Sequence, residues 1–153
     1  MTSEERTQGT RGTQLRLTIA PDPKQSGTVR QALLAFAQDQ GVEPGEVVDF
    51  VTAVGEALAN AIEHAQTGEP IVVAAWTLDG CLFASVSDHG VGFVPPRAQT
   101  TALPDTYAER GRGLAIMRRY ADVFRVHSVP GEGTRVTLGC QIRPPDDALG
   151  CTR

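Results

Sequence analysis

Residues 89–112 are the feature that most constrains how this chain can fold. They are rich in proline and glycine and show no apolar periodicity, whereas the residues on both sides follow helix-like and strand-like patterns. Loops longer than about 12–15 residues inside a compact domain are usually functional or disordered. We therefore expect two patterned segments joined by one long loop of this kind.

The patterns on either side of this loop predict an α+β fold. Leu15, Leu17 and Ile19 alternate with polar residues, as in a half-buried strand. Helices are predicted at 26–40, 44–66 and 113–121, and later strands at 71–78, 82–86, 123–129 and 134–142. Strands joined by tight turns pair antiparallel. We expect a two-layer α/β sandwich, with a mixed, mostly antiparallel sheet and helices on one face.

Length and composition fit a single domain and exclude several classes of protein. The chain has 153 residues, 41% of them hydrophobic, and a net charge of −4. No apolar run reaches the length of a membrane span, and the polar N-terminus does not match a signal peptide. The acidic balance argues against direct nucleic-acid binding. We expect a cytoplasmic protein with a domain at 13–142, a disordered N-terminal tail at 1–12 and a flexible C-terminal tail at 143–153.

The basic residues exclude two common kinds of phosphate site. Thirteen of them are arginines, and Lys24 is the only lysine. Lys24 is not in a Gly-rich loop, which excludes a P-loop, and the strand lysine and His-Arg-Asp loop of the common eukaryotic protein kinases are missing. Any phosphate chemistry must proceed without lysine. The cysteines contain no Cys-x-x-Cys pair, so no zinc site is predicted.

Three polar residues are spaced along the predicted helix 44–66. Glu56, Asn60 and His64 are four residues apart, which places them within about 80° of one another, opposite the apolar stripe. Taken alone, they are more simply the polar face of an amphipathic helix. Glu63 on the same face shows how easily such a face fills with polar residues.

An Asp-x-Gly-x-Gly segment follows the second hairpin strand. Gly90 and Gly92 permit a sharp turn and a close approach of the backbone to a planar ligand. The Asp88 carboxylate can accept a hydrogen bond from an exocyclic amine. The simpler alternative is an Asx-type turn that closes the strand.

Two further glycine pairs precede predicted elements. Gly111–Leu114 lies directly before the third helix, where free N–H groups and the helix dipole favour an anion, and this provides a phosphate site without lysine. A plain helix-entry loop explains the segment equally well. Gly131–Thr134 opens the last strand, and a tight hairpin explains it by itself.

In this order and spacing, the segments resemble the GHKL ATPase superfamily. They resemble the motifs of the Bergerat ATP-binding fold in chain order. The segment at Glu56 resembles the N box, the segment at Asp88 the G1 box and the proline-rich loop the lid. The segment at Gly111 resembles the G2 box, and Thr134 resembles the closing Thr. The conjunction is specific, whereas one box is not. A stand-alone domain of this size is similar to the anti-sigma-factor serine kinases of bacterial partner-switching systems (the RsbW/SpoIIAB-like group).

The resemblance implies a role for each matching residue. Glu56 would be the general base that takes the proton from a substrate serine, Asn60 would bind Mg²⁺, and Asp88 would bind the adenine amino group. Arg110 and Arg112 are both candidates for the basic residue at the end of the lid. The other implied nucleotide-binding residues are Gly90, Gly92, Gly111, Gly113, Leu114 and Thr134.

The resemblance also implies a function and partners. The protein would be an ATP- and Mg²⁺-dependent protein-serine kinase that phosphorylates a STAS-type anti-sigma-factor antagonist, sequesters a sigma factor and forms a homodimer. The first alternative is a nucleotide-dependent regulatory module that acts by contact without phosphoryl transfer. The second is a structural α+β domain that binds no nucleotide.

Overall fold

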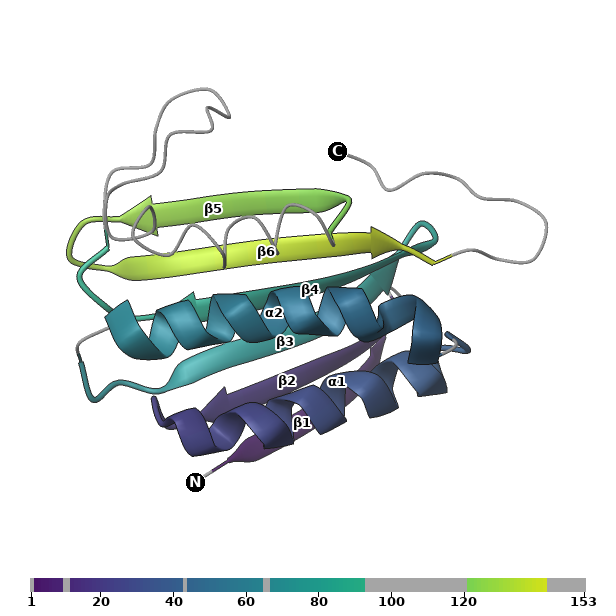
Figure 1. The fold of residues 1–153 in the computed structure, drawn as a ribbon, viewed down its shortest axis with the longest axis horizontal. Coiled ribbons are helices and arrows are strands. Elements are labelled where there is room, and N and C mark those ends of the chain that lie inside the picture. The colour runs from purple at the N-terminus through teal and green to yellow at the C-terminus, as the bar shows by residue number, and fades with distance from the viewer. Residues whose placement is uncertain (1, 10–11, 43, 65–66, 93–120, 143–153) are drawn as a thin grey trace.

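The computed structural model describes residues 2–9, 12–42, 44–64, 67–92 and 121–142. Figure 1 shows their arrangement as one sheet and two long helices. The strands are β1 (Ser3–Gly9), β2 (Gly12–Ile19), β3 (Ile71–Leu78), β4 (Cys81–Asp88), β5 (Val123–Val129) and β6 (Gly133–Gln141). The helices are α1 (Ser26–Asp39), which follows the short turn η1 (Pro23–Gln25), and α2 (Pro44–His64).

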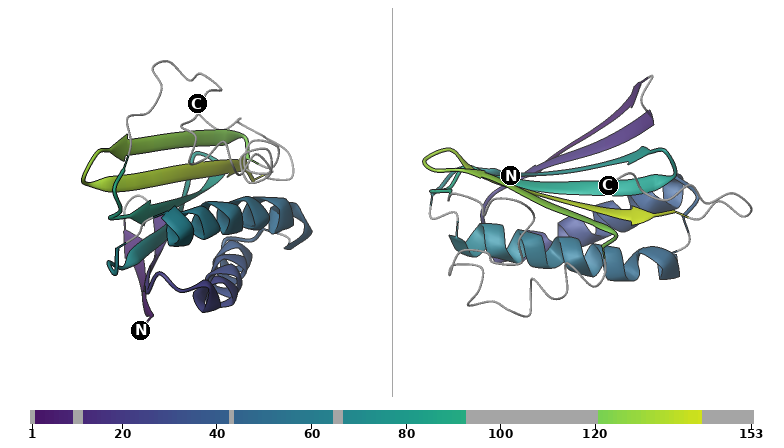
Figure 2. Two further views of the ribbon diagram at one scale, coloured as in Figure 1. Left: turned by 60° about the vertical axis from the view of Figure 1, so that its left-hand side comes forward. Right: turned by 90° about the horizontal axis from the view of Figure 1, so that it is seen from above.

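The six strands form a sheet in the order β1-β2-β3-β4-β6-β5. Both helices lie on the same face of this sheet (Figure 2), so the expected α+β two-layer sandwich is confirmed. All five strand pairings are antiparallel, so the described sheet is not mixed. The chain passes through α1 and α2 between β2 and β3, and β3 then runs antiparallel to β2. β4, β6 and β5 each run antiparallel to the strand beside them.

Periodicity located most elements correctly. Both helices and the strands β2, β3, β5 and β6 agree with the prediction to within a few residues. The strand predicted at 82–86 is longer, and its extension includes Asp88. The predicted helix at 113–121, apart from its last residue, and the tail at 143–153 lie outside the described residues.

The N-terminal strand β1 was not expected, because residues 1–12 were predicted to be a disordered tail. Residues 3–9 instead pair with β2, in a register that runs from Ser3 opposite Thr18 to Gly9 opposite Gly12. β1 is one of the two edge strands of the described sheet, and its charged sequence is typical of an exposed edge. Its sequence lacks the apolar alternation by which strands are identified, and β1 is held by its backbone pairing with β2. Sequence analysis therefore could not identify it.

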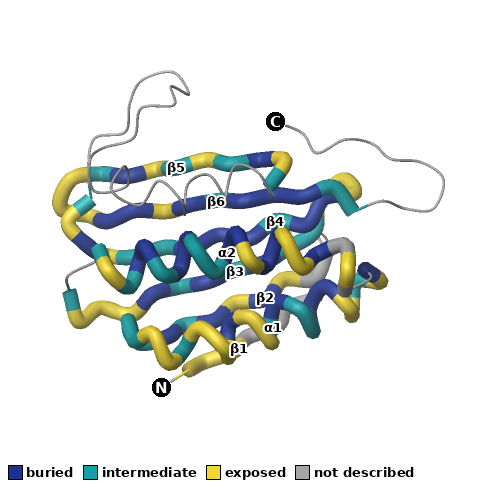
Figure 3. Tube along the Cα trace, viewed as in Figure 1, coloured by how far each residue is buried: buried dark blue, intermediate teal, exposed yellow. Residues whose placement is uncertain are grey.

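The core lies between the sheet and the two helices (Figure 3). Every second residue of β2 faces it, and Leu15, Leu17 and Ile19 are almost fully buried. Phe36 from α1 and Phe50 from α2 are the largest fully buried side chains. No helix in the described part of the chain is long and apolar enough to cross a membrane.

The turn between β5 and β6 contains two glycines that form a natural comparison. Both have positive φ, +80° at Gly131 and +117° at Gly133. A Cβ on Gly131 would meet nothing within 4 Å, whereas a Cβ on Gly133 would lie 2.0 Å from the backbone oxygen of Asp88. Side-chain-free backbone at Gly133 therefore allows β6 to begin directly against the end of β4.

We predict that Gly133→Ala destabilises the protein more than Gly131→Ala. The change at Gly131 adds only the left-handed backbone cost of about 1–2 kcal/mol. The change at Gly133 adds strain and also forces β4 and β6 apart. Urea unfolding of both variants measures the difference, and an equal loss of unfolding free energy would show that β4 and β6 are not held closely at this point.

Candidate functional site

Four elements converge at one end of the sandwich. The C-terminal ends of α2, β4 and β5 and the start of β6 lie together, on the left of Figure 1. Helix α2 packs against β4 and β6, which are neighbours in the sheet. This convergence brings the predicted residues Asn60, Asp88 and Thr134 to the same end of the fold.

Asn60 is a buried polar residue whose side chain lacks a partner. It is 1% exposed, and within the described residues neither its Oδ1 nor its Nδ2 has a hydrogen bond. Leaving such a group unsatisfied costs about 1–3 kcal/mol. Buried groups of this kind require an explanation, and a bound ligand or ion is one. Asn60 is therefore the strongest indication of a binding site in the described chain.

The helix places its polar stripe differently from the prediction. Asn60 is buried, and Glu56 and His64 are half-buried, so the stripe does not lie opposite the apolar face. The buried face of α2 is wider than expected, because Ala53 and Ala57 are also buried. Asn60 lies at the border of this wide face, where the helix meets the sheet.

Asp88 ends β4 and organises the turn that follows. Its Oδ1 accepts hydrogen bonds from the N–H of Gly90 at 2.8 Å and from the N–H of Thr134 at 3.3 Å. The first bond is the Asx-type turn that the sequence left open as an alternative. Within the described residues Oδ2 makes no hydrogen bond. Asp88 can thus keep the turn in place with one oxygen and accept a bond from a ligand with the other.

Burial changes the acidity of this carboxyl. Removal from water raises the pKa of Asp88 above its ordinary value, because the charged form is less well solvated. The hydrogen bonds from Gly90 and Thr134, and the nearby His89 and His64, lower the pKa and offset part of this rise. A partly buried acceptor in such a position is suited to hold an amine donor from a ligand.

Gly92 allows two segments of the protein backbone, the residues after β4 and the end of β5, to approach each other closely. Its φ is +64°, and a Cβ there would lie 2.1 Å from the backbone oxygen of Val129 at the end of β5. The N–H of Gly131 donates to the oxygen of Val91 at 2.7 Å. The glycine pattern predicted a close approach to a planar ligand, whereas in the structure Gly92 packs the segment after β4 against the end of β5.

Ser128 is a site residue that the sequence did not reveal. Its Oγ lies 2.8 Å from the Oγ1 of Thr134, and it also donates to the oxygen of Gly133 at 3.2 Å. Both hydroxyl residues are buried. A signal existed: Phe124 and Val126 point to the helix-covered face of the sheet, and Ser128 continues this series with a polar residue.

Several predicted residues cannot be placed. Arg110, Gly111, Arg112, Gly113 and Leu114 lie outside the described residues, so their nucleotide-binding roles stay predictions.

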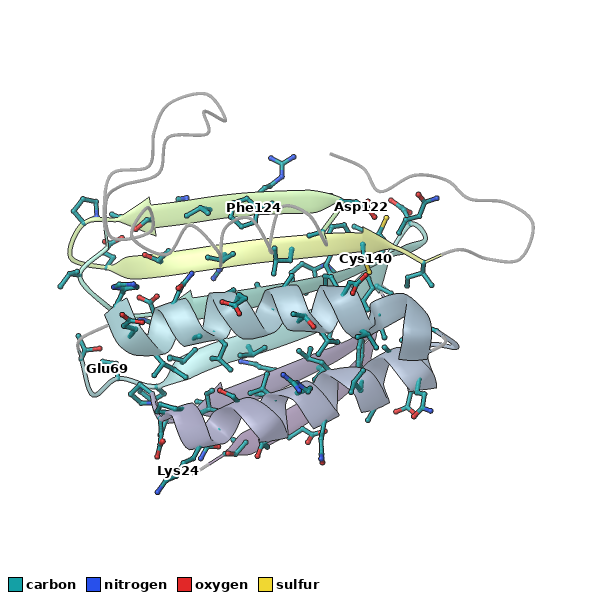
Figure 4. The ribbon with its side chains drawn as sticks, in the orientation of Figure 1. Lys24, Glu69, Asp122, Phe124 and Cys140 are labelled. Carbon is teal, nitrogen blue, oxygen red and sulfur yellow. The ribbon has the colours of Figure 1, made fainter. Side chains whose placement is uncertain are left out.

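Lys24 lies in η1 before α1 and is exposed (Figure 4). Its backbone N–H donates to Asp22 Oδ1 at 2.9 Å, so it belongs to the cap of that turn.

The geometry defines a class of protein before any comparison is made. An antiparallel sheet carries two helices on one face, and three polar features meet at one end: a buried amide that has no hydrogen bond within the described residues, a turn-forming carboxylate and a buried hydroxyl pair. This is an α+β domain with a polar site between α2 and the ends of the central strands.

Comparisons with known proteins identify the family. A model of the histidine kinase-like ATPase domain matches residues 19–140. The anti-sigma F factor of Caldanaerobacter subterraneus subsp. tengcongensis is 32% identical over 114 residues, which are 71% of this chain and 80% of that protein. The anti-sigma F factor of Pasteuria penetrans is 33% identical over 116 residues, 71% of this chain and 77% of that protein.

A solved structure agrees with this result. The crystal structure of the RsbU and RsbW domains of Rv1364c from Mycobacterium tuberculosis matches with a TM-score of 0.65 at 27% identity, covering 84% of this chain and 32% of that longer chain. This chain belongs to the histidine kinase-like ATPase domain family, within the GHKL superfamily, and its similarity is to the anti-sigma-factor branch.

We predict that Asp88→Asn makes stability less dependent on pH. Because the folded-state pKa is raised, wild type gains stability from Asp88 below the ordinary pKa of about 3.9 and loses it as pH rises through the folded-state value. Asparagine keeps the Oδ1 acceptor without a charge. The variant should therefore gain unfolding free energy relative to wild type as pH rises through this window.

Urea titrations of both proteins between about pH 3.5 and about pH 7 measure this difference. Subtracting the two curves removes every contribution that is the same in both proteins. A difference that is constant across the range would contradict the raised pKa.

Proposed function

We propose that this protein binds Mg²⁺-ATP and is an anti-sigma-factor protein-serine kinase of a partner-switching system. The observation that carries the proposal is Asn60: a buried amide with no hydrogen bond to any described residue, one helical turn after Glu56 and at the same end of the fold as Asp88. The names of the relatives, anti-sigma F factor, support the regulatory part of the proposal.

Asp88 and Thr134 would bind the adenine ring. The open Oδ2 of Asp88 is a natural acceptor for the exocyclic amine, and Oδ1 is held by two backbone N–H groups that orient the carboxylate. Thr134 lies directly opposite Asp88 on β6 and supports the base from the neighbouring strand. Gly90 and Gly92 shape the turn that frames this pocket.

Asn60 fits a role as a ligand of Mg²⁺. Mg²⁺ prefers oxygen ligands and is usually held by one or two protein groups together with substrate phosphates and water. The described part of the chain contains no cluster of three His, Cys, Asp or Glu side chains that could hold a metal alone. When bound, the ion would neutralise charge on the transferred phosphoryl group.

Glu56 would act on the serine of the protein substrate. It is half-buried on α2, one turn before Asn60, so its carboxylate lies near the proposed phosphate end of the nucleotide. A base in this position removes the hydroxyl proton as the serine oxygen bonds to the γ-phosphorus, while the bond from that phosphorus to the β–γ bridging oxygen breaks and ADP leaves. Arg110–Leu114 would supply backbone amides and a cation to the phosphates.

The proposed partners follow from the relatives. We propose a sigma factor that is sequestered and a STAS-type antagonist that is phosphorylated, with the kinase acting as a cytoplasmic homodimer. The comparisons name anti-sigma factors and an RsbW domain, and the chain covers most of the length of the anti-sigma F factors. No direct contact with nucleic acid is proposed.

We predict that Glu56→Gln binds Mg²⁺-ATP as wild type does but transfers phosphate more slowly by about 10²–10⁴-fold, the usual contribution of a positioned base. Transfer of labelled γ-phosphate to a STAS-domain antagonist measures the rate. Glu63→Gln is the matched control, since Glu63 is exposed on the same helix.

If Glu56→Gln transferred phosphate at the wild-type rate, Glu56 would not be the base. Tight binding of the antagonist without any gain of phosphate, by wild type as well, would instead support the module that acts by contact.

We predict different losses of nucleotide affinity for Asp88→Ala and Asn60→Ala. Removing a charged hydrogen bond to adenine should cost about 1.5–3 kcal/mol, with or without metal. Removing Asn60 should mainly abolish the Mg²⁺ dependence of binding. Calorimetric titration of ATP and ADP, with and without Mg²⁺, measures both. Saturable binding that ignores both substitutions would place the nucleotide elsewhere, and no binding by folded wild type would disprove the nucleotide site.

A further inference from the structure

Three residues form one row across the sheet at the proposed adenine pocket. Asp88 on β4 lies opposite Thr134 on β6, and Thr134 lies opposite Ser128 on β5. Directly paired residues of neighbouring strands point to the same face. Residues two positions along each strand, such as Val86 and Val136, belong to the core beneath the helices, so the row faces the helix-covered side.

The protons within this row are determined by the hydrogen bonds. A serine hydroxyl has one proton to donate and two lone pairs that accept. A carbonyl can only accept, so the bond between Ser128 Oγ and the oxygen of Gly133 uses the proton of Ser128. Either hydroxyl can donate the 2.8 Å bond between Ser128 and Thr134, and because the proton of Ser128 goes to Gly133 we assign Thr134 as its donor.

This orientation leaves Thr134 as an acceptor. Its proton points to Ser128, so only lone pairs of Oγ1 remain for a ligand. The neighbouring Asp88 carboxylate, when ionised, also only accepts. The pocket therefore presents two acceptors side by side, and both suit the donor group of adenine, whereas guanine and hypoxanthine carry a carbonyl oxygen at the same position.

We propose that Ser128 is a specificity-determining positioning residue: it holds the Thr134 hydroxyl as an acceptor, so that the pocket selects purines with an exocyclic 6-amine over purines with a 6-carbonyl. This inference rests on the proposed nucleotide site. Ser128 acts through Thr134 and is itself buried, 4% exposed. A site built around fixed polar groups rejects an analogue that leaves those groups unpaired.

The test compares the Kd of Mg²⁺-ATP with that of Mg²⁺-inosine triphosphate. Wild type should prefer ATP. In Ser128→Ala the Thr134 proton is released, the hydroxyl can rotate and donate to the carbonyl of the inosine base, and the preference for ATP should fall by about fivefold to tenfold, the equivalent of one neutral hydrogen bond. A purely structural role would weaken both nucleotides equally.

Ser85→Ala is the matched control. Ser85 is a buried serine of the same sheet, 7% exposed, but it lies on β4 between the core residues Ala84 and Val86 and so points to the opposite face. Its removal should leave the ratio of the two Kd values unchanged. Ser128→Thr, which keeps a hydroxyl, should retain the wild-type ratio.

Thr134→Val provides an independent measurement if Ser128→Ala does not fold. Removing a pure acceptor should weaken ATP binding and leave inosine triphosphate binding unchanged or stronger. Equal loss for both nucleotides, or an unchanged ratio in folded Ser128→Ala, would overturn the role of Ser128 while ATP binding stands. Failure of wild type to bind either nucleotide would overturn the proposed function and this inference with it.

Discussion

The pairing of β4 with β6 is the interaction on which the site depends. It places Asp88 opposite Thr134, and the first residue of β6 packs so closely on the oxygen of Asp88 that it must be a glycine. The Thr134 N–H then donates to the Asp88 side chain. A slip of one residue in this register would move every side chain of β6 to the other face of the sheet. The ligand-facing groups are therefore fixed by the same hydrogen bonds that hold the sheet together.

The site also gives up stability that the rest of the fold must provide. Asn60 is buried without a hydrogen bond in the described residues, and Asp88 is a carboxylate withdrawn from water. Either group could be replaced by an apolar side chain in a protein selected only for stability. Both lie where α2 packs against β4 and β6. Groups that cost free energy in the empty pocket are the ones whose interactions with a ligand are gained at full strength.

The sequence predicted the elements well because the buried faces follow simple periods. Alternating residues located β2, and helical spacing located α1 and α2. It could not predict β1, which is held by backbone pairing rather than by an apolar pattern. It also misplaced Asn60, since 100° spacing gives the angle of a residue around the helix but not how far the neighbouring strands extend over it. Ser128 was missed because its role depends on a contact with the next strand, six residues along the chain.

The same reasoning explains why a chain with a single lysine is suited to a nucleotide. The described residues Asn60, Asp88, Ser128 and Thr134 are neutral or acidic, so in the proposed site they would bind the base and the metal rather than the phosphates. In the proposed function, charge neutralisation would come from Mg²⁺ held by Asn60 and from the Arg110–Leu114 segment. Such a division separates two kinds of selectivity. On this proposal the strands would set which base is accepted, because their hydrogen bonds fix the direction of each donor and acceptor, and α2 with the Arg110–Leu114 segment would respond to the number of phosphates.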